Sequence, residues 1–239
     1  MRINNHTIQK GNKVFVIAEI GMNHNGSIIR AKKLIDYASA MKVHCVKFQM
    51  RSLKDLYSKD ALDISSSDLS TQYTINLLKK FELSFKDFKN LSIYAKRKNV
   101  IFLCTPWDKK SVDNLEKLHV PAYKIASADL TNIDLIEYIL KTKKPLILST
   151  GMSNEKEIDI TVKFLKSKKA TFALLHTNST YPTPLKDINL NYIDKLIRKH
   201  NVPIGYSGHD RGIISTLSAV AKGACIIERH ITLDKNMEG

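Results

Sequence analysis

Two histidines stand at the ends of two short apolar runs, and their placement predicts a metal site. His209 follows the run in VPIGYSGHD (202–210), and His230 ends the run ACIIERH (224–230). The segment between them, 211–223, has the spacing of an amphipathic helix. If the two runs are parallel neighbouring strands, both imidazoles lie at the same end of the sheet and can share one divalent ion. Water or a substrate oxygen must then complete the coordination, and such an open site polarises a carbonyl group.

A carboxylate, Glu19, directly follows the five apolar residues VFVIA. A buried carboxylate is costly unless it is paired, so a functional role is favoured for this residue. Further polar residues stand within or just after later apolar runs, and their lysine and hydroxyl groups suit a phosphate or carboxylate ligand. These residues are Lys47, Gln49, Thr105, Lys124, Ser127, Asp129, Ser149, Ser179, Tyr181 and Ser207.

Considered one at a time, several of these residues could have purely structural roles. A lysine near a strand end is often a surface residue with a buried stem, and serine or threonine there often caps the next helix. His24 and His176 are interpreted as core or hinge histidines with satisfied hydrogen bonds. Only the set as a whole favours an anion-binding site.

Regular alternation of apolar runs with helical segments positions these residues. Buried strands are expected at 14–20, 43–49, 100–104, 122–125, 145–149, 171–176, 202–205 and 224–230. Helices are expected at 27–41, around 85–94, and at 108–118, 132–141, 153–167, 186–200 and 211–223. Eight strands alternating with seven helices predict an α/β fold, the (β/α)8 TIM barrel, whose C-terminal face would gather the polar residues.

Two segments depart from this alternation. Residues 1–13 are predicted to form an N-terminal hairpin that plugs the bottom of the barrel, with Ile3 and Ile8 as its apolar contacts. Residues 50–82 are a longer polar connection, interpreted as an excursion over the active face. The whole chain, 1–239, is expected to be one barrel domain, and its sequence ends about where an eighth helix would begin.

Composition narrows the class of protein. The chain has a formal net charge of +15, but its lysines mostly fall on helical faces between apolar positions, so a solvated basic surface is favoured over a nucleic-acid partner. No run is apolar enough to span a membrane, and the start MRINNHTIQK does not resemble a signal peptide, so a cytoplasmic protein is expected. Cys45, Cys104 and Cys225 are expected to be buried free thiols.

Several segments occur in the order typical of one enzyme family. They are IAEIGMNHNG (17–26), VKFQ (46–49), CTPWD (104–108), YKIASAD (123–129), LILSTGMS (146–153), STYPTP (179–184), GYSGHD (205–210) and ERHITLDKNMEG (228–239). The chain thereby resembles the sialic acid synthases over essentially its whole length. That resemblance implies condensation of phosphoenolpyruvate with N-acetylmannosamine or a related 2-acetamido sugar, which yields a nonulosonic acid and phosphate.

The resemblance also implies roles for individual residues. Glu19 would be the acid/base residue, and His209 and His230 would bind the divalent metal, Mn²⁺ or Mg²⁺. The sugar would contact Gln49, Asp129 and Tyr181. Phosphoenolpyruvate would be held by Lys47, Thr105, Lys124, Ser127, Ser149, Ser179 and Ser207. A homodimer is implied for the complete protein.

The chain differs from the family pattern in places that leave alternatives open. Asp129 stands where many bacterial members have glutamate, and Gly208 stands where some have aspartate. Family members continue into an eighth helix and an antifreeze-like domain, which these 239 residues do not contain. The chain is therefore expected to be a synthase of sialic acid or of a legionaminic-type acid, or alternatively a truncated, non-catalytic barrel that binds phosphoenolpyruvate or another phosphate.

Overall fold

Eight parallel strands form the centre of the molecule. The computed structural model describes residues 1–59 and 69–237, with only the backbone of 69–74. The strands are β3 (Phe15–Gly21), β4 (Cys45–Met50), β5 (Ile101–Pro106), β6 (Tyr123–Ile125), β7 (Leu146–Ser149), β8 (Phe172–Thr177), β9 (Ile204–Gly208) and β10 (Ile226–His230). Their order in the sheet is β5-β4-β3-β10-β9-β8-β7-β6.

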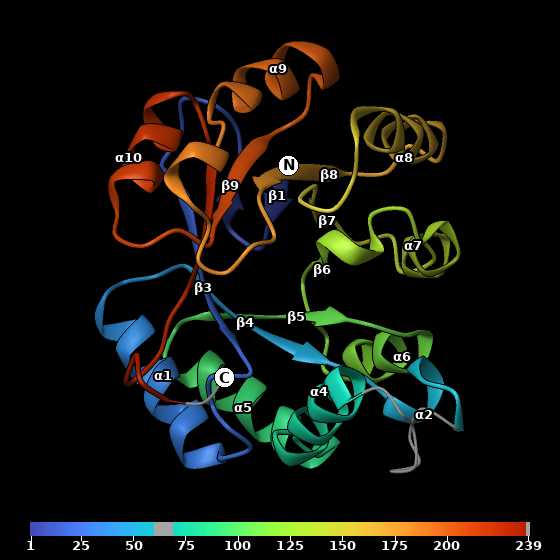
Figure 1. The fold of residues 1–239 in the computed structure, drawn as a ribbon, viewed down its shortest axis with the longest axis vertical. Coiled ribbons are helices and arrows are strands. Elements are labelled where there is room, and N and C mark those ends of the chain that lie inside the picture. Colours follow the sequence, from blue (N-terminus) through green and yellow to red (C-terminus); the bar gives the residue numbers. More distant parts are fainter. Residues whose placement is uncertain (60–68, 238–239) are drawn as a thin grey trace.

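The sheet almost closes on itself. β10 pairs in parallel with both β3 and β9, and the two outermost strands, β5 and β6, also contact each other. Helices lie around the outside of the strands (Figure 1). This arrangement confirms the predicted (β/α)8 barrel, in which the carboxyl ends of all the strands face the same way.

The helices that surround the sheet include the seven that were predicted and two further helices within the described part of the connection 50–82. They are α1 (Ile28–Ala40), α2 (Leu53–Leu56), α4 (Leu69–Lys80), α5 (Phe85–Arg97), α6 (Lys109–Lys117), α7 (Ile133–Leu140), α8 (Glu155–Ser167), α9 (Asn191–His200) and α10 (Ile214–Ala221). Short-range signals define several starts: Ser84 and Asp87 form a capping box at α5. On that helix Phe88 and Leu91 are buried against the sheet, as their spacing requires.

Several boundaries differ from their predictions, and the largest difference is at α9, which begins at Asn191 and not at residue 186. β9 extends to Gly208, three residues beyond the expected end at Gly205, because Tyr206, Ser207 and Gly208 all pair with β10. The polar sequence YSG is typical of a turn, but the neighbouring strand satisfies its backbone groups. As a result α10 begins at Ile214 and not at the predicted residue 211.

The interior of the barrel is layered. Its lower part is apolar and consists of Phe15, Ile17, Cys45, Leu103, Ala122, Ile147, Ala173, Leu175, Cys225 and Ile226, together with Ile3 and Ile8 of the N-terminal segment. Strands β1 (Arg2–Ile3) and β2 (His6–Thr7) pair antiparallel, which confirms the predicted hairpin and its contact with the barrel bottom. Because side chains alternate along a strand, the residues two positions further on point into the same interior, one layer higher.

The remaining segments frame the barrel. The connection from 50 to 82 contains α2 and α4, and its residues 60–68 lie outside the described part. In the described ranges 1–59 and 69–237, no helix follows β10 and no helix is long and apolar enough to cross a membrane. All three cysteines are buried and free, as expected.

Candidate functional site

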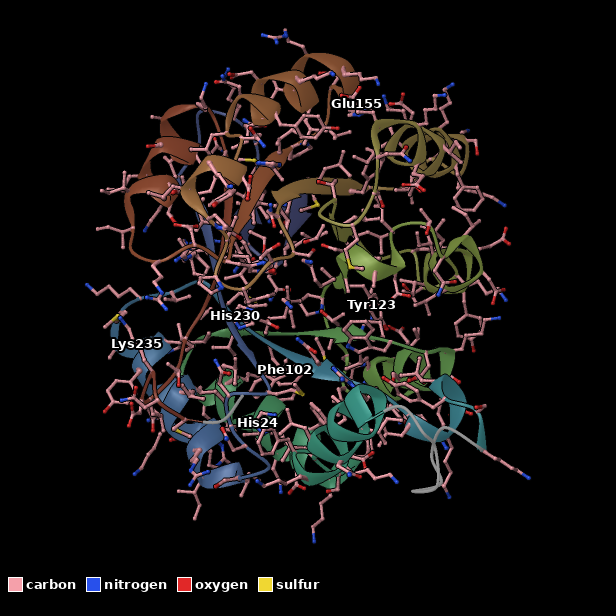
Figure 2. All side chains as sticks on the ribbon, in the orientation of Figure 1. His24, Phe102, Tyr123, Glu155, His230 and Lys235 are labelled. Atoms are coloured by element: carbon pink, nitrogen blue, oxygen red, sulfur yellow. The ribbon has the colours of Figure 1, made fainter. Side chains whose placement is uncertain are left out.

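A cavity of about 230 Å³ opens at the carboxyl ends of the strands. It is lined by every residue that the sequence assigned to the site except Asp129. The lining set is Glu19, Lys47, Gln49, Thr105, Trp107, Lys124, Ala126, Ser127, Ala128, Ser149, Met152, Thr177, Ser179, Tyr181, Ser207, His209, Glu228 and His230. In Figure 2, His230 lies among the strands near the centre of the view, whereas Glu155 lies on the helical periphery.

Four ionisable side chains form the floor of this cavity, and each is only 2% to 6% exposed. Lys47 Nζ lies 2.7 Å from Glu19 Oε2 and 3.8 Å from Glu228 Oε2. Lys124 Nζ lies 3.8 Å from the other oxygen of Glu228. Two ammonium groups therefore alternate with two carboxylates, and the four formal charges cancel when all are ionised.

The protonation states follow from this alternation. Burial raises the pKa of Glu19, although Lys47 partly offsets it. Burial opposes ionisation of Glu228 as well, but Lys124 and Lys47 outweigh it and lower the pKa of Glu228 to about 2. Burial lowers the pKa of Lys124 to about 8, whereas the two carboxylates raise the pKa of Lys47 in spite of its burial. Glu228 is thus the permanent anion of the set, and Lys124 is the cation that gives up its proton most readily.

Hydroxyl groups hold the two ammonium groups in place. Lys47 Nζ donates to Thr105 Oγ1 at 3.1 Å, and Lys124 Nζ donates to Ser149 Oγ at 2.6 Å. Ser207 Oγ donates to Glu228 Oε1 at 2.9 Å. This cluster presents several donors to one small volume, which is the arrangement that a phosphate or carboxylate requires.

Two further serines close one wall of the cavity around Gly151. The backbone N–H of Gly151 donates to Ser127 Oγ at 3.3 Å. A methyl group on Gly151 would lie 2.7 Å from Ser179 Oγ and 3.1 Å from Ser127 Oγ. Glycine at this position therefore allows both hydroxyls to approach the same point of the wall.

Gln49 contacts Glu19 from a second side, and its neighbour Arg51 determines how the Gln49 amide is oriented. Gln49 Nε2 donates to Glu19 Oε1 at 3.0 Å, and Arg51 donates to Gln49 Oε1 at 2.5 Å. Since a guanidinium group only donates, the Gln49 oxygen must face Arg51 and its NH₂ group must face Glu19. The Arg51 guanidinium in turn lies over the Trp107 ring, 5.0 Å from the ring centroid.

The two histidines meet at the rim of the cavity. His209 Nδ1 lies 2.6 Å from the carbonyl oxygen of Asn178, which only accepts, so Nδ1 carries the proton and Nε2 has a free lone pair. The hydroxyl of Tyr181 lies 2.7 Å from His209 Nε2 and 3.1 Å from His230 Nε2. One oxygen therefore sits between the two Nε2 atoms, which confirms that both rings point toward a common position.

This donor set fits a divalent ion. Desolvation lowers the pKa of both imidazoles to about 4, so they are neutral at neutral pH and available as ligands. The hydrogen bond from His209 Nδ1 to a backbone carbonyl is typical of metal-binding histidines. Within the described ranges no group of three or more His, Cys, Asp or Glu side chains is arranged to hold a metal, so oxygen ligands from outside this set are needed.

Some site residues were not predicted from the sequence. Glu228 is the most important, and one signal was present: it stands two residues before His230 on the same strand, so it faces the same interior. Trp107 also lines the cavity, and its buried Nε1 has no hydrogen-bond partner among the described residues.

Asp129 is the one predicted residue that the structure does not bring to the cavity. It ends a short 3₁₀ turn, Ser127–Asp129, and its Oδ1 accepts a hydrogen bond from Asn132 Nδ2 at 3.1 Å. Its second oxygen is buried without a hydrogen-bond partner in the described part of the chain. Its predicted contact with the sugar stays a prediction.

His24 and His176 are core residues, as interpreted from the sequence. His24 Nδ1 accepts a hydrogen bond from the backbone N–H of Gly26 at 3.1 Å. His176 Nε2 lies 2.6 Å from the carbonyl oxygen of Ile188. Both side chains are buried and neither lines the central cavity.

Comparison with known proteins gives consistent matches. Residues 34–239 match the NeuB family. The chain is 41% identical to the N,N'-diacetyllegionaminic acid synthase of Campylobacter jejuni, over 95% of this chain and 70% of that protein. It is 40% identical to the N-acetylneuraminate-9-phosphate synthase of Drosophila melanogaster, over 95% of this chain and 62% of that protein.

A solved structure agrees with the fold. The crystal structure of the N-acetylneuraminic acid synthetase of Leptospira borgpetersenii, in complex with citrate, superimposes with a TM-score of 0.90 at 37% identity. The match covers 98% of this chain and 78% of that one. The chain therefore spans between 62% and 78% of the length of these proteins.

Proposed function

Because the chain belongs to the NeuB family, we propose that it condenses phosphoenolpyruvate with a 2-acetamido sugar to give a nonulosonic acid and inorganic phosphate. The observation that carries this proposal is the buried cluster of Lys47 and Lys124 with their hydroxyl partners. Phosphoenolpyruvate carries a carboxylate and a phosphate close together, and this cluster offers two cations and several hydroxyl donors within one cavity of matching chemistry.

The anion would lie across the cavity floor. Lys47 with Thr105, and Lys124 with Ser149, form two donor pairs on neighbouring strands of the barrel interior. Ser207 and the serines beside Gly151, Ser127 and Ser179, would complete the cradle. Holding the anion in this way orients C3 of phosphoenolpyruvate toward the cavity mouth, where the second substrate must enter.

The histidine end would bind the acceptor sugar. His209 and His230 would hold a divalent ion, Mn²⁺ or Mg²⁺, which when bound supplies a Lewis acid that polarises the aldehyde oxygen of the open-chain sugar. Gln49 and Tyr181 line the adjoining wall and offer amide and hydroxyl groups to the sugar. The carbon–carbon bond then forms between C3 of phosphoenolpyruvate and the aldehyde carbon.

Glu19 lies between the two ends of the site. After carbon–carbon bond formation, water adds at C2 and the tetrahedral carbon loses phosphate. The Glu19 carboxylate, whose pKa is raised by burial, can orient that water and accept its proton. Lys47, which contacts both Glu19 and Thr105, keeps the carboxylate next to the bound anion.

A second candidate is a barrel that binds phosphoenolpyruvate without condensing it. Its support is the position of Asp129, which the family resemblance assigns to the sugar but which does not line the cavity. The same cradle would then serve as a binding site only.

Product analysis separates the two candidates. The protein is incubated with phosphoenolpyruvate, Mn²⁺ and, in parallel, N-acetylmannosamine, its 6-phosphate or a 2,4-diacetamido hexose. We expect one of these acceptors to yield a nine-carbon 2-keto acid by mass spectrometry, with equal release of phosphate. Binding of phosphoenolpyruvate without any new keto acid would support the second candidate instead.

A further inference from the structure

The side chain of Arg229, on β10, crosses over Gly208 of β9 to reach Asp210, the residue after His209. Arg229 precedes His230 on β10 and pairs in register with Gly208 on β9. Its guanidinium donates to Asp210 Oδ1 at 2.6 Å, to the Asp210 carbonyl at 2.5 Å and to the Gly212 carbonyl at 3.0 Å. The residue before one histidine is therefore bonded to the residue after the other.

Asp210 is the centre of this contact and is well buried, at 5% exposed. Besides Arg229, its Oδ1 accepts a hydrogen bond from the Tyr206 hydroxyl at 2.7 Å. Arg229 and Tyr206 both donate to this one carboxylate oxygen, and Arg229 also donates to the Asp210 backbone carbonyl, so the buried residue is held in one orientation. The loop that begins at His209 is thereby attached to strand β10.

The crossing depends on the absence of a side chain at position 208. A methyl group on Gly208 would lie 2.3 Å from the guanidinium of Arg229, 2.6 Å from the Tyr206 ring and 2.9 Å from Asp210 Oδ1. These separations are shorter than van der Waals contact, so any side chain there must displace the network. Glycine at 208 is explained by packing, since three side chains converge on its Cα.

The other side of the same loop is fixed separately. The carbonyl of His209 accepts a hydrogen bond from the backbone N–H of Thr183 at 3.1 Å, and its Nδ1 contacts Asn178. His209 thus has one attachment toward β8 and one, through Asp210, toward β10. The second attachment links the backbone next to His209 to the strand that carries His230, in addition to the Tyr181 hydroxyl, which contacts both rings.

We propose that Arg229 and Asp210 form a positioning pair that sets the separation of His209 and His230. Gly208 is required because it leaves room for the Arg229 guanidinium to reach Asp210. The inference rests on the divalent-ion site of the proposed function. Neither Arg229 nor Asp210 lines the cavity, so they act on the ion through the two histidines and not by contact with substrate. Substitution of residues that orient metal ligands in this way typically weakens metal affinity about 10- to 100-fold.

The test measures Mn²⁺ binding without substrates, from the electron paramagnetic resonance signal of the free ion. The variants are Arg229→Ala, Gly208→Ala, the double variant, and Arg211→Ala as a matched control, since Arg211 is an exposed arginine in the same loop. We expect the two single variants to bind Mn²⁺ about tenfold or more weakly, and Arg211→Ala to bind normally. In the double variant the losses should overlap and not multiply, because both substitutions disrupt the same crossing.

A purely structural role has a different outcome. It would lower the melting temperature of the variants but leave the Mn²⁺ affinity of the folded protein unchanged, and that result overturns the proposal. Losses that multiply in the double variant also overturn it, since Gly208 would then act independently of Arg229.

Amide hydrogen exchange tests the positioning pair independently of the proposed metal site. If the unsubstituted protein binds no Mn²⁺, the metal site of the proposed function is wrong. The positioning pair is then still supported if Arg229→Ala specifically loses amide protection at 209–212, and it is contradicted if protection there is unchanged.

Discussion

The carboxylate of Glu228 lies 3.8 Å from the ammonium group of Lys124, and both side chains are almost wholly buried. Glu228 is at the same distance from Lys47, so one carboxylate serves two buried cations. Two ammonium groups in one cavity repel each other, and this anion allows both to stay protonated in the absence of ligand.

Replacing Glu228 by glutamine should destabilise the fold. The Glu228→Gln side chain keeps the size and the contact with Ser207 but leaves Lys47 and Lys124 sharing only Glu19. Removing one member of a buried charge cluster typically costs about 3 kcal/mol of unfolding free energy. Urea denaturation at pH 7 measures this cost.

The matched control for that experiment is Glu82→Gln. Glu82 is exposed, so its neutralisation should change the unfolding free energy by less than about 0.5 kcal/mol. Equal stabilities of the two variants would show that Glu228 does not support the lysines.

Affinity for phosphoenolpyruvate should fall as the pH rises above about 8. Burial lowers the pKa of Lys124 to about 8, so in the free protein this side chain is charged below that pH and neutral above it. A bound anion favours the charged form, and binding above pH 8 must therefore take up a proton, which weakens affinity by up to about tenfold per pH unit.

Calorimetric titrations from pH 6.5 to 9.5 measure this dependence, with Lys124→Arg as the comparison. Arginine stays protonated throughout the range, so the slope above pH 8 should disappear in that variant. An identical slope in both proteins would assign the titration to another group.

Glu19→Gln should separate binding from turnover. Glutamine can still contact Lys47 and Gln49 but cannot accept a proton, so kcat should fall by about 100-fold or more while the dissociation constant of phosphoenolpyruvate changes little. Rapid-quench kinetics and calorimetry measure the two quantities. A variant that loses binding and keeps kcat would place Glu19 in the anion cradle and not at the reacting carbons.

The site residues on strands were the most predictable part of this molecule. Lys47 and Gln49 interrupt an apolar run at alternate positions, so one interior face collects both. The same alternation points from His230 back to Glu228, because both residues lie on the interior face of β10. The histidine at the end of the run ACIIERH indicates a site, and the alternation along the strand adds the carboxylate to it.

Contacts that depend on strand register were not predictable. Arg229 meets Asp210 because β10 pairs with β9 in the register that places Arg229 beside Gly208, and nothing local in either segment encodes that alignment. Asp129 is a similar case, since the direction of its side chain is decided by the 3₁₀ turn after β6 and its bond to Asn132. Local patterns predict which residues approach the barrel mouth, whereas turn geometry decides which of them enter it.

The most direct test of the proposed reaction is release of phosphate from phosphoenolpyruvate in the presence of the acceptor sugar and Mn²⁺. It compares the unsubstituted protein with His209→Asn and with His119→Asn, a matched substitution at an exposed position outside the cavity. We predict release that requires both sugar and Mn²⁺ in the unsubstituted protein and in His119→Asn, and a loss of about 100-fold or more in His209→Asn. Release that is independent of the sugar, or equal in the two variants, would contradict the account.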